Sequence, residues 1–136
     1  MAAEARGPQG EPALRAIAMP ADTNPAGDIF GGWLLAQMDL AGGTTAHHRA
    51  RGRVATIAIE AMTFHKPVHV GDEVSCYTVI KRIGRSSITV SVETWTRPFD
   101  GGAQTKVTEG VFTYVALGPD GRPRAVPPEA SAPPES

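Results

Sequence analysis

The chain of 136 residues has a single cysteine and almost no net charge. Cys76 has no second cysteine to pair with, so an intramolecular disulfide is excluded. The net charge of −1 gives no electrostatic reason to expect a nucleic acid or a membrane surface as partner. Residues 1–12 are small, polar and rich in Pro and Gly, without the charged and then apolar pattern of a secretory leader. These absences predict a cytoplasmic protein with no membrane insertion.

The chain also lacks the spacing of a metal site. Its histidines are scattered, and the adjacent pair His47 and His48 falls at the expected end of a helix. Zinc sites need four clustered ligands, usually Cys and His, so zinc is not expected here. Cys76 falls on the same face of a predicted strand as Val74 and Thr78, which indicates a core residue rather than a nucleophile.

Proline is unevenly distributed along the chain. Eight of the twelve prolines lie in residues 1–12 and 118–136, which contain almost no large apolar side chains. Such segments bury too little apolar area to offset the loss of chain entropy on folding, so both are predicted to be largely disordered. The folded unit is predicted to be one domain at residues 13–117.

Residues 29–46 carry one charged side chain, that of Asp39. Apolar residues lie all round a helix drawn through this stretch, which is typical of a helix buried on every side. Asp39 and two glycine pairs make a membrane span too polar and too broken. We therefore expect a central helix with Asp28 as its N-cap, ending near residues 47–51 before Gly52.

The sequence period changes from 3.6 to 2 after this helix. Apolar and polar residues then alternate in four segments separated by turns that contain glycine, and a short apolar run at 14–19 precedes the helix. One strand, one helix and four strands predict an α+β fold, with one long helix wrapped by a curved antiparallel sheet of about five strands. The open edges of such a sheet favour a dimer that extends it. The four segments are 53–64, 73–83, 87–93 and 107–117.

Four separated blocks of the sequence are distinctive. They read MPADTNPAGDIFGGW at 19–33, QMD at 37–39, MTFHKPVHVGD at 62–72 and TEGVFTYVA at 108–116. Together they resemble the hotdog-fold acyl-CoA thioesterases, in particular the YciA-like group related to the cytosolic acyl-CoA hydrolases. The resemblance implies hydrolysis of an acyl-CoA to coenzyme A and a carboxylic acid, without a metal or organic cofactor. It also implies self-association as a dimer, with a trimer of dimers as the larger assembly.

The same resemblance makes Asn24 and Asp39 the catalytic pair, contributed by opposite protomers of the dimer. A carboxylate at Asp39 can act as general base, or can attack the thioester directly to form a mixed anhydride, and the sequence does not separate these routes. The structural alternative for Asp39 is a buried carboxylate held by backbone amides or by an arginine. Asparagine in a loop rich in Pro and Gly commonly forms a turn, and only the motif assigns Asn24 to the water or the carbonyl.

Three further groups of residues are predicted to bind the substrate. Gly31 and Gly32 are expected to present backbone amides to the thioester oxygen at the start of the helix, with tight packing as the alternative reason for these glycines. Lys66 lies in the block that resembles the pantetheine-side strand end. The turn at 81–87 combines cations and hydroxyls that suit phosphate oxygens, although a solvated hairpin tip has the same composition. The residues of this turn predicted to bind CoA are Gly84, Arg85, Ser86 and Ser87.

Two other functions compete with hydrolysis. A hotdog hydratase binds the same thioesters but usually needs a histidine paired with a carboxylate, and the helix has no histidine before its end. A non-catalytic acyl-CoA sensor would keep the phosphate site and dispense with the base. Asp39 together with Asn24 favours hydrolysis over both.

Overall fold

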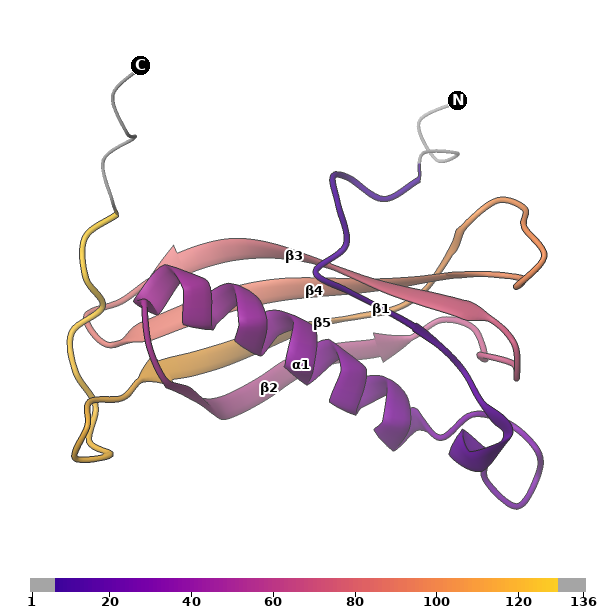
Figure 1. Ribbon diagram of the computed structural model, residues 1–136, viewed down its shortest axis with the longest axis horizontal. Helices are drawn as coiled ribbons and strands as arrows, with labels where there is room; N and C mark the ends of the chain where they lie inside the picture. Colours follow the sequence, from indigo (N-terminus) through magenta and orange to yellow (C-terminus); the bar gives the residue numbers. More distant parts are fainter. Residues whose placement is uncertain (1–6, 130–136) are drawn as a thin grey trace.

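A computed structural model describes residues 7–129, in which one long helix lies against a five-stranded sheet (Figure 1). The α+β arrangement predicted from the sequence is confirmed. No helix among the described residues is long and apolar enough to cross a membrane. In chain order the elements are β1 (Leu14–Ile17), η2 (Pro20–Asp22), α1 (Gly31–Ala50), β2 (Val54–Phe64), β3 (Glu73–Ile83), β4 (Ser87–Arg97) and β5 (Thr105–Ala116).

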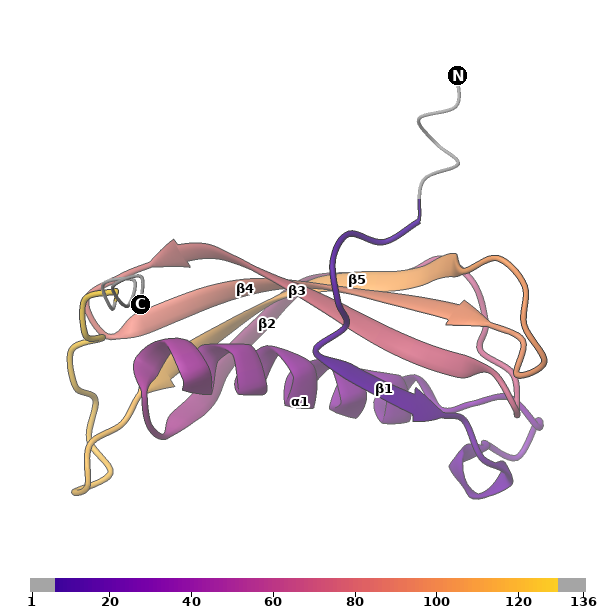
Figure 2. The same cartoon turned by 45° about the horizontal axis from the view of Figure 1, so that its top comes forward.

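The strands lie in the order β1-β3-β4-β5-β2, and every neighbouring pair is antiparallel. The strands arch over α1 (Figure 2). Two register shifts bend β2, and Ala61, which lies within the second shift between Glu60 and Thr63, adopts a left-handed φ of 54°. β2 pairs with β5 on one side only, so its other side is an edge. Ile57, Ile59 and Phe64 are exposed along this strand.

The core consists of two clusters. The larger one packs Met38 of α1 against the centre of the sheet, where Phe112 and Tyr114 are among its largest members. The smaller one lies near the start of the helix and includes Ile29 and Leu34. The sequence predicts a helix covered on every side, but in a single chain α1 is covered by the sheet along one face, and Leu40 is 59% exposed.

The start of α1 differs from the prediction. The helix begins at Gly31, and no side chain caps it. Asp28 is not the N-cap, because its backbone N–H donates to Asn24 Oδ1 in the preceding loop. The other end agrees with the prediction, since α1 ends at Ala50 and Arg51 adopts the left-handed C-cap conformation.

Residues 118–128, here called the C-terminal segment, contact the end of α1. The guanidinium group of Arg124 donates to the carbonyl oxygens of Ala50 and Leu117, and the Val126 N–H donates to Arg85 O. Composition predicts disorder from residue 118 onward, yet this part of the chain is held by hydrogen bonds. One of them uses the carbonyl of Ala50, which as one of the last four of the helix has no intrahelical donor. Residues 1–6 and 130–136, also predicted to be disordered, lie outside the described residues.

Candidate active site

Asp39 borders a pocket of about 410 Å³ between α1 and the first half of β2. Its side chain is half-buried. Polar side chains from several elements meet there, which is unusual for the surface of an otherwise apolar helix. The polar residues of this lining are Asp39, Thr44, His47, Arg53, Thr56 and Tyr114.

The carboxylate of Asp39 is held by two hydroxyl groups. Thr56 Oγ1 donates to Asp39 Oδ1 over 2.7 Å, and the Tyr114 hydroxyl donates to the same oxygen over 3.0 Å. Within residues 7–129 no hydrogen bond falls on Oδ2 and no cation pairs with the carboxylate. Asp39 is therefore not the arginine-bound structural carboxylate that the sequence left as an alternative.

Tyr114 reaches Asp39 because Gly42 leaves room for it. A β-carbon at Gly42 would collide with the Tyr114 hydroxyl, so this glycine is required by close approach rather than by backbone conformation. Burial and, second, the nearby Asp39 carboxylate raise the pKa of Tyr114. Its hydroxyl therefore stays protonated and available as a donor across the neutral pH range.

A second pocket of about 320 Å³ lies at the start of α1. It brings together two residues that the sequence predicted separately, Gly31 and Lys66, along with the exposed ring of Phe64. The first amides of a helix have no intrahelical acceptor, so they are free to face a bound oxygen. Gly32 is exposed next to them, with open space where a side chain would be.

Asn24 forms a turn in the loop before the helix. Its Oδ1 accepts the backbone N–H groups of Ala26 and Asp28, at 2.9 and 3.1 Å. The turn-forming role is thus observed, and among the described residues its amide nitrogen has no hydrogen-bond partner. That nitrogen remains available as a donor for a group outside the chain.

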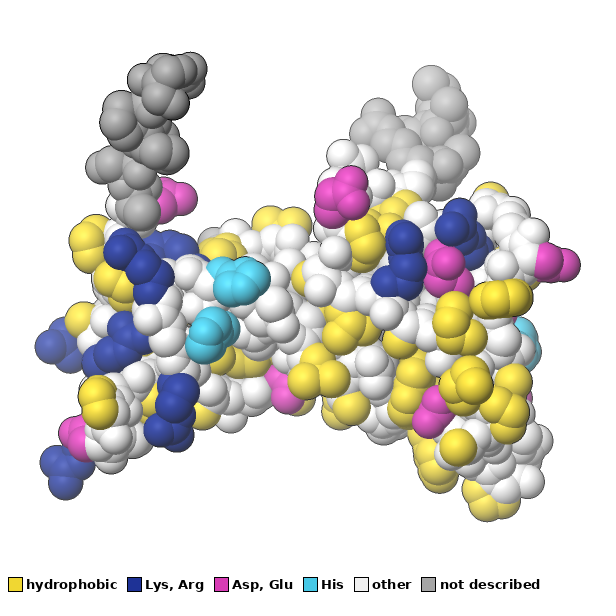
Figure 3. Space-filling model, viewed as in Figure 1, with side chains coloured by type: hydrophobic (Ala, Val, Ile, Leu, Met, Phe, Trp, Pro, Cys, Tyr) yellow, Lys and Arg dark blue, Asp and Glu magenta, His cyan; other side chains and the backbone are white. Residues whose placement is uncertain are grey.

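The turn between β3 and β4 lies at the opposite end of the molecule from the start of α1 and the end of β2 (Figure 1). It is anchored there by hydrogen bonds from the Ala116 N–H to Ser86 O and from the Gly84 N–H to Ser87 O, both over 2.8 Å. Lys and Arg side chains gather at this end of the surface, while apolar side chains concentrate at the other (Figure 3). Since a helix of 20 residues is about 30 Å long, one chain does not bring all the predicted site residues together.

The family model of the thioesterase superfamily matches residues 26–98. The chain belongs to the thioesterase superfamily. Its matched region contains Asp39, Thr56 and Lys66, and ends one residue after β4, at the start of the loop that leads to β5 and Tyr114.

Relatives of this superfamily member cover nearly its whole length. It is 50% identical over 123 residues to the acyl-CoA thioester hydrolase YciA of Salmonella typhimurium, a match that covers 88% of this chain and 92% of the relative. A hexameric thioesterase structure from Yersinia pestis is 52% identical, covers 88% of this chain and 98% of its own, and superposes with a TM-score of 0.84. A hexameric hotdog-fold thioesterase of Campylobacter jejuni is 43% identical, with coverages of 87% and 91% and a TM-score of 0.81. The predicted YciA-like resemblance and the hotdog fold are confirmed.

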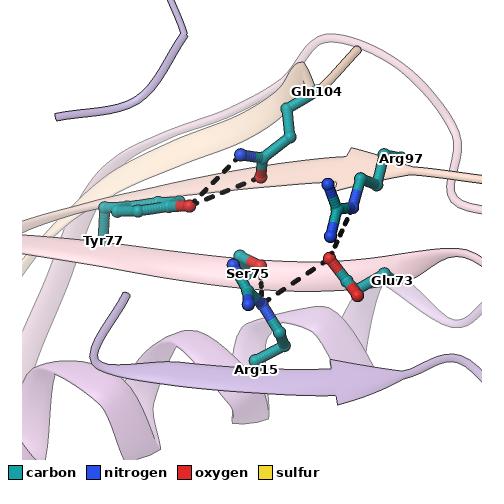
Figure 4. Close-up of polar contacts among 6 residues, drawn as sticks. All are labelled: Arg15, Glu73, Ser75, Tyr77, Arg97 and Gln104. Carbon is teal, nitrogen blue, oxygen red and sulfur yellow. Dashed lines mark hydrogen bonds and ion pairs between the residues drawn. The ribbon is translucent and has the colours of Figure 1, made fainter. Parts of the chain in front are cut away.

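A different polar cluster in this thioesterase-superfamily chain ties β1 to the sheet (Figure 4). Glu73 accepts from Arg97 Nε over 2.7 Å and lies 3.6 Å from Arg15 Nε, which also donates to Ser75 Oγ. Its charge is neutralised by arginine, so this cluster is structural. Among residues 7–129 no three His, Cys, Asp or Glu side chains form a group that could hold a metal ion.

Sequence reasoning missed Thr56 and Tyr114. Thr56 gives no signal, because a threonine in a strand is ordinary. Tyr114 gives a weak signal, since it shares one face of a predicted strand with Phe112 and a buried tyrosine hydroxyl needs a hydrogen-bond partner. Which partner it finds depends on the packing of β5 under α1.

Proposed function

We propose that this protein is an acyl-CoA thioester hydrolase and that Asp39 provides its base or nucleophile. The observation that carries the proposal is the state of the Asp39 carboxylate, which borders a pocket, is held by neutral hydroxyls and keeps one oxygen free. Identity of 50% to an acyl-CoA thioester hydrolase over most of the chain supports the same reaction.

Both routes open to Asp39 complete the reaction without a metal or organic cofactor. As a base, Asp39 takes a proton from water while the water oxygen attacks the thioester carbonyl. The C–S bond then breaks, and the coenzyme A thiolate leaves and takes up the proton. As a nucleophile, the free carboxylate oxygen displaces the thiolate to form a mixed anhydride, which water hydrolyses to the acid and the original carboxylate.

The complete site is assembled, in this proposal, from two protomers. Asn24 of the partner subunit would point its free amide nitrogen at the water or the carbonyl, and the amides of Gly31 and Gly32 would face the developing oxyanion. Exposed apolar side chains along the β2 edge and at Leu40 support a dimer that extends the sheet. Hexameric relatives support a trimer of dimers as the full assembly.

Coenzyme A would bind through its phosphates at the hairpin residues Gly84, Arg85, Ser86 and Ser87. Arginine forks and turn amides suit phosphate oxygens, and the C-terminal segment holds the hairpin through the hydrogen bond to Arg85 O. Lys66 would contact the pantetheine side from the other pocket. The proposed location is the cytoplasm, in keeping with a free and buried cysteine.

The test is hydrolysis of a panel of acyl-CoAs from short to long chains, followed by release of free thiol. Asp39→Asn should reduce release to background while coenzyme A still binds, and Asp100→Asn in the exposed β4–β5 loop is the matched control. No release by the parent protein from any acyl-CoA, with coenzyme A bound, would replace the hydrolase with the sensor. The hydratase alternative is disfavoured at Asp39, because His47 lies two helical turns away. The histidine–carboxylate pair of the described residues, His65 Nε2 with Glu109 Oε2 at 2.9 Å, does not include Asp39.

A further inference from the structure

The Tyr114 hydroxyl contacts two oxygens of the same residue. It lies 3.0 Å from Asp39 Oδ1 and 3.0 Å from the backbone oxygen of Asp39. A phenol has one hydrogen to donate, so this is a three-centre hydrogen bond that joins the carboxylate to its own main chain. Together with the hydrogen bond from Thr56 at 2.7 Å, this bond gives Oδ1 two donors and directs Oδ2 away from both of them.

The donor itself is rigid. Tyr114 is 1% exposed and stacks on Phe112 with ring centroids 6.4 Å apart and planes 11° apart. On the helix side, Gly42 and Gly43 form the surface that its ring contacts. Because β5 lies between β4 and β2, the position of this hydroxyl is set by the core of the sheet.

We infer that Tyr114 is a positioning residue for hydrolysis, because it fixes the rotamer of Asp39 and keeps Oδ2 as the reacting oxygen. The inference rests on the proposed function of Asp39. The groups that face Asp39 are Thr56 from β2, Tyr114 from β5, and His47 and Arg53 in the lining of the same pocket. Of these, only the two hydroxyls contact its carboxylate.

The test is Tyr114→Phe, which removes the hydroxyl and keeps the ring. We expect kcat to fall by about ten- to hundredfold with KM for acyl-CoA unchanged, because the carboxylate is no longer held in its reactive rotamer.

Two further variants separate positioning from packing. Tyr77→Phe makes the same chemical change at a tyrosine that contacts Gln104 at 3.4 Å, and it should leave both kcat and KM unchanged. Gly42→Ala displaces the Tyr114 hydroxyl from the helix side. It should reproduce the fall in kcat with unchanged KM, although alanine has the higher helix propensity.

Parental kcat in a folded Tyr114→Phe protein would overturn the inference. Absence of hydrolysis by the parent protein would instead overturn the proposed function. The inference would then be judged by the ¹³C chemical shift of the Asp39 carboxyl group, measured by NMR at one fixed pH. An identical chemical shift in the parent and in Tyr114→Phe would refute it, and a changed chemical shift in the variant would support it.

Discussion

Asp39 and Glu73 are the centres of two clusters built from similar parts. Each cluster contains a carboxylate and a hydroxyl residue, Thr56 with Asp39 in one case and Ser75 with Glu73 in the other, where Arg15 contacts both. Glu73 is neutralised by two arginines, whereas the side chains that donate to the Asp39 carboxylate within residues 7–129 are neutral hydroxyls. Arginine side chains around a carboxylate neutralise its charge and hold strands together. Hydroxyls orient a carboxylate and leave its charge free to react.

The largest expected effect comes from mixing two inactive variants. If Asp39 of one protomer works with Asn24 of the other, Asp39→Asn and Asn24→Ala should each be nearly inactive alone. Hybrid dimers would contain one intact site, so random mixing restores about a quarter of the parental sites. The measurement is thiol release after the two variants are co-expressed in equal amounts with the same tag, so that homodimers and hybrid dimers are purified together. Activity no higher than that of either variant would place both residues in one chain.

A stability effect of intermediate size is expected at Cys76, which lies beside Ser75 in the structural cluster. Burial raises the pKa of the Cys76 thiol from 9.0 to about 11. Because the thiol has a higher pKa in the folded protein than in the unfolded chain, it contributes stability that is fully present below pH 9. This contribution is lost as the pH rises to about 11, and the free energy of unfolding then falls by about 2–3 kcal/mol. Urea unfolding at pH 7 and pH 10.5 measures this loss. In Cys76→Ala the free energies of unfolding at the two pH values should differ by less than in the parent protein. A difference equal to that of the parent would contradict the assignment.

Glu73→Gln should lower the free energy of unfolding by about 1–2 kcal/mol, because Arg15 and Arg97 lose a charged hydrogen-bond acceptor. Hydrolysis should not change. Chemical denaturation and thiol release on the same preparation test both statements. The counterpart Asp39→Asn should do the opposite, with activity lost and stability nearly kept, and a large activity loss in Glu73→Gln would remove the distinction between the clusters.

The smallest effect is expected at Lys66, a cation that forms no ion pair among the described residues and lines the pocket at the start of α1. Lys66→Met keeps the length of the side chain and removes its charge. We expect KM for acyl-CoA to rise roughly three- to tenfold with kcat unchanged, the loss of one charged contact. Lys106→Met, which instead disrupts ion pairs to Glu93 and Glu109, serves as the control and should leave KM at its parental value.

The fold could be predicted from the sequence because its signals are local. The alternation of apolar and polar residues predicted β3 with its observed bounds. The change of the sequence period from 3.6 to 2 after the helix separated α1 from the strands. Asp39 was identified for the same reason, as the one charge in an apolar helix. The helix start was wrong because Asn24 takes the Asp28 N–H and Ile29 donates to Val68 O, so the chain stays extended until Gly31.

The surroundings of Asp39 could not be predicted, because they depend on contacts between distant segments. Thr56 is 17 residues from Asp39 along the chain, and Tyr114 is 75 residues away. Such contacts follow from the register of β2 on β5 and from the space at Gly42, which no local pattern encodes. The ordered part of the C-terminal segment was missed for a related reason, since the acceptor for Arg124 lies on a helix 74 residues earlier.

The position of β5 also has a consequence for the newly made chain. β2 pairs only with β5, which lies between β2 and β4, so the sheet has a gap until the last strand has been synthesised. Until then a ribosome-bound chain exposes β2 without its pairing partner, and unpaired strands of this kind aggregate readily. The carboxylate at position 39 emerges long before the tyrosine that holds it. Slowing translation between β4 and β5 should therefore lower the yield of folded protein more than slowing it after Ala116.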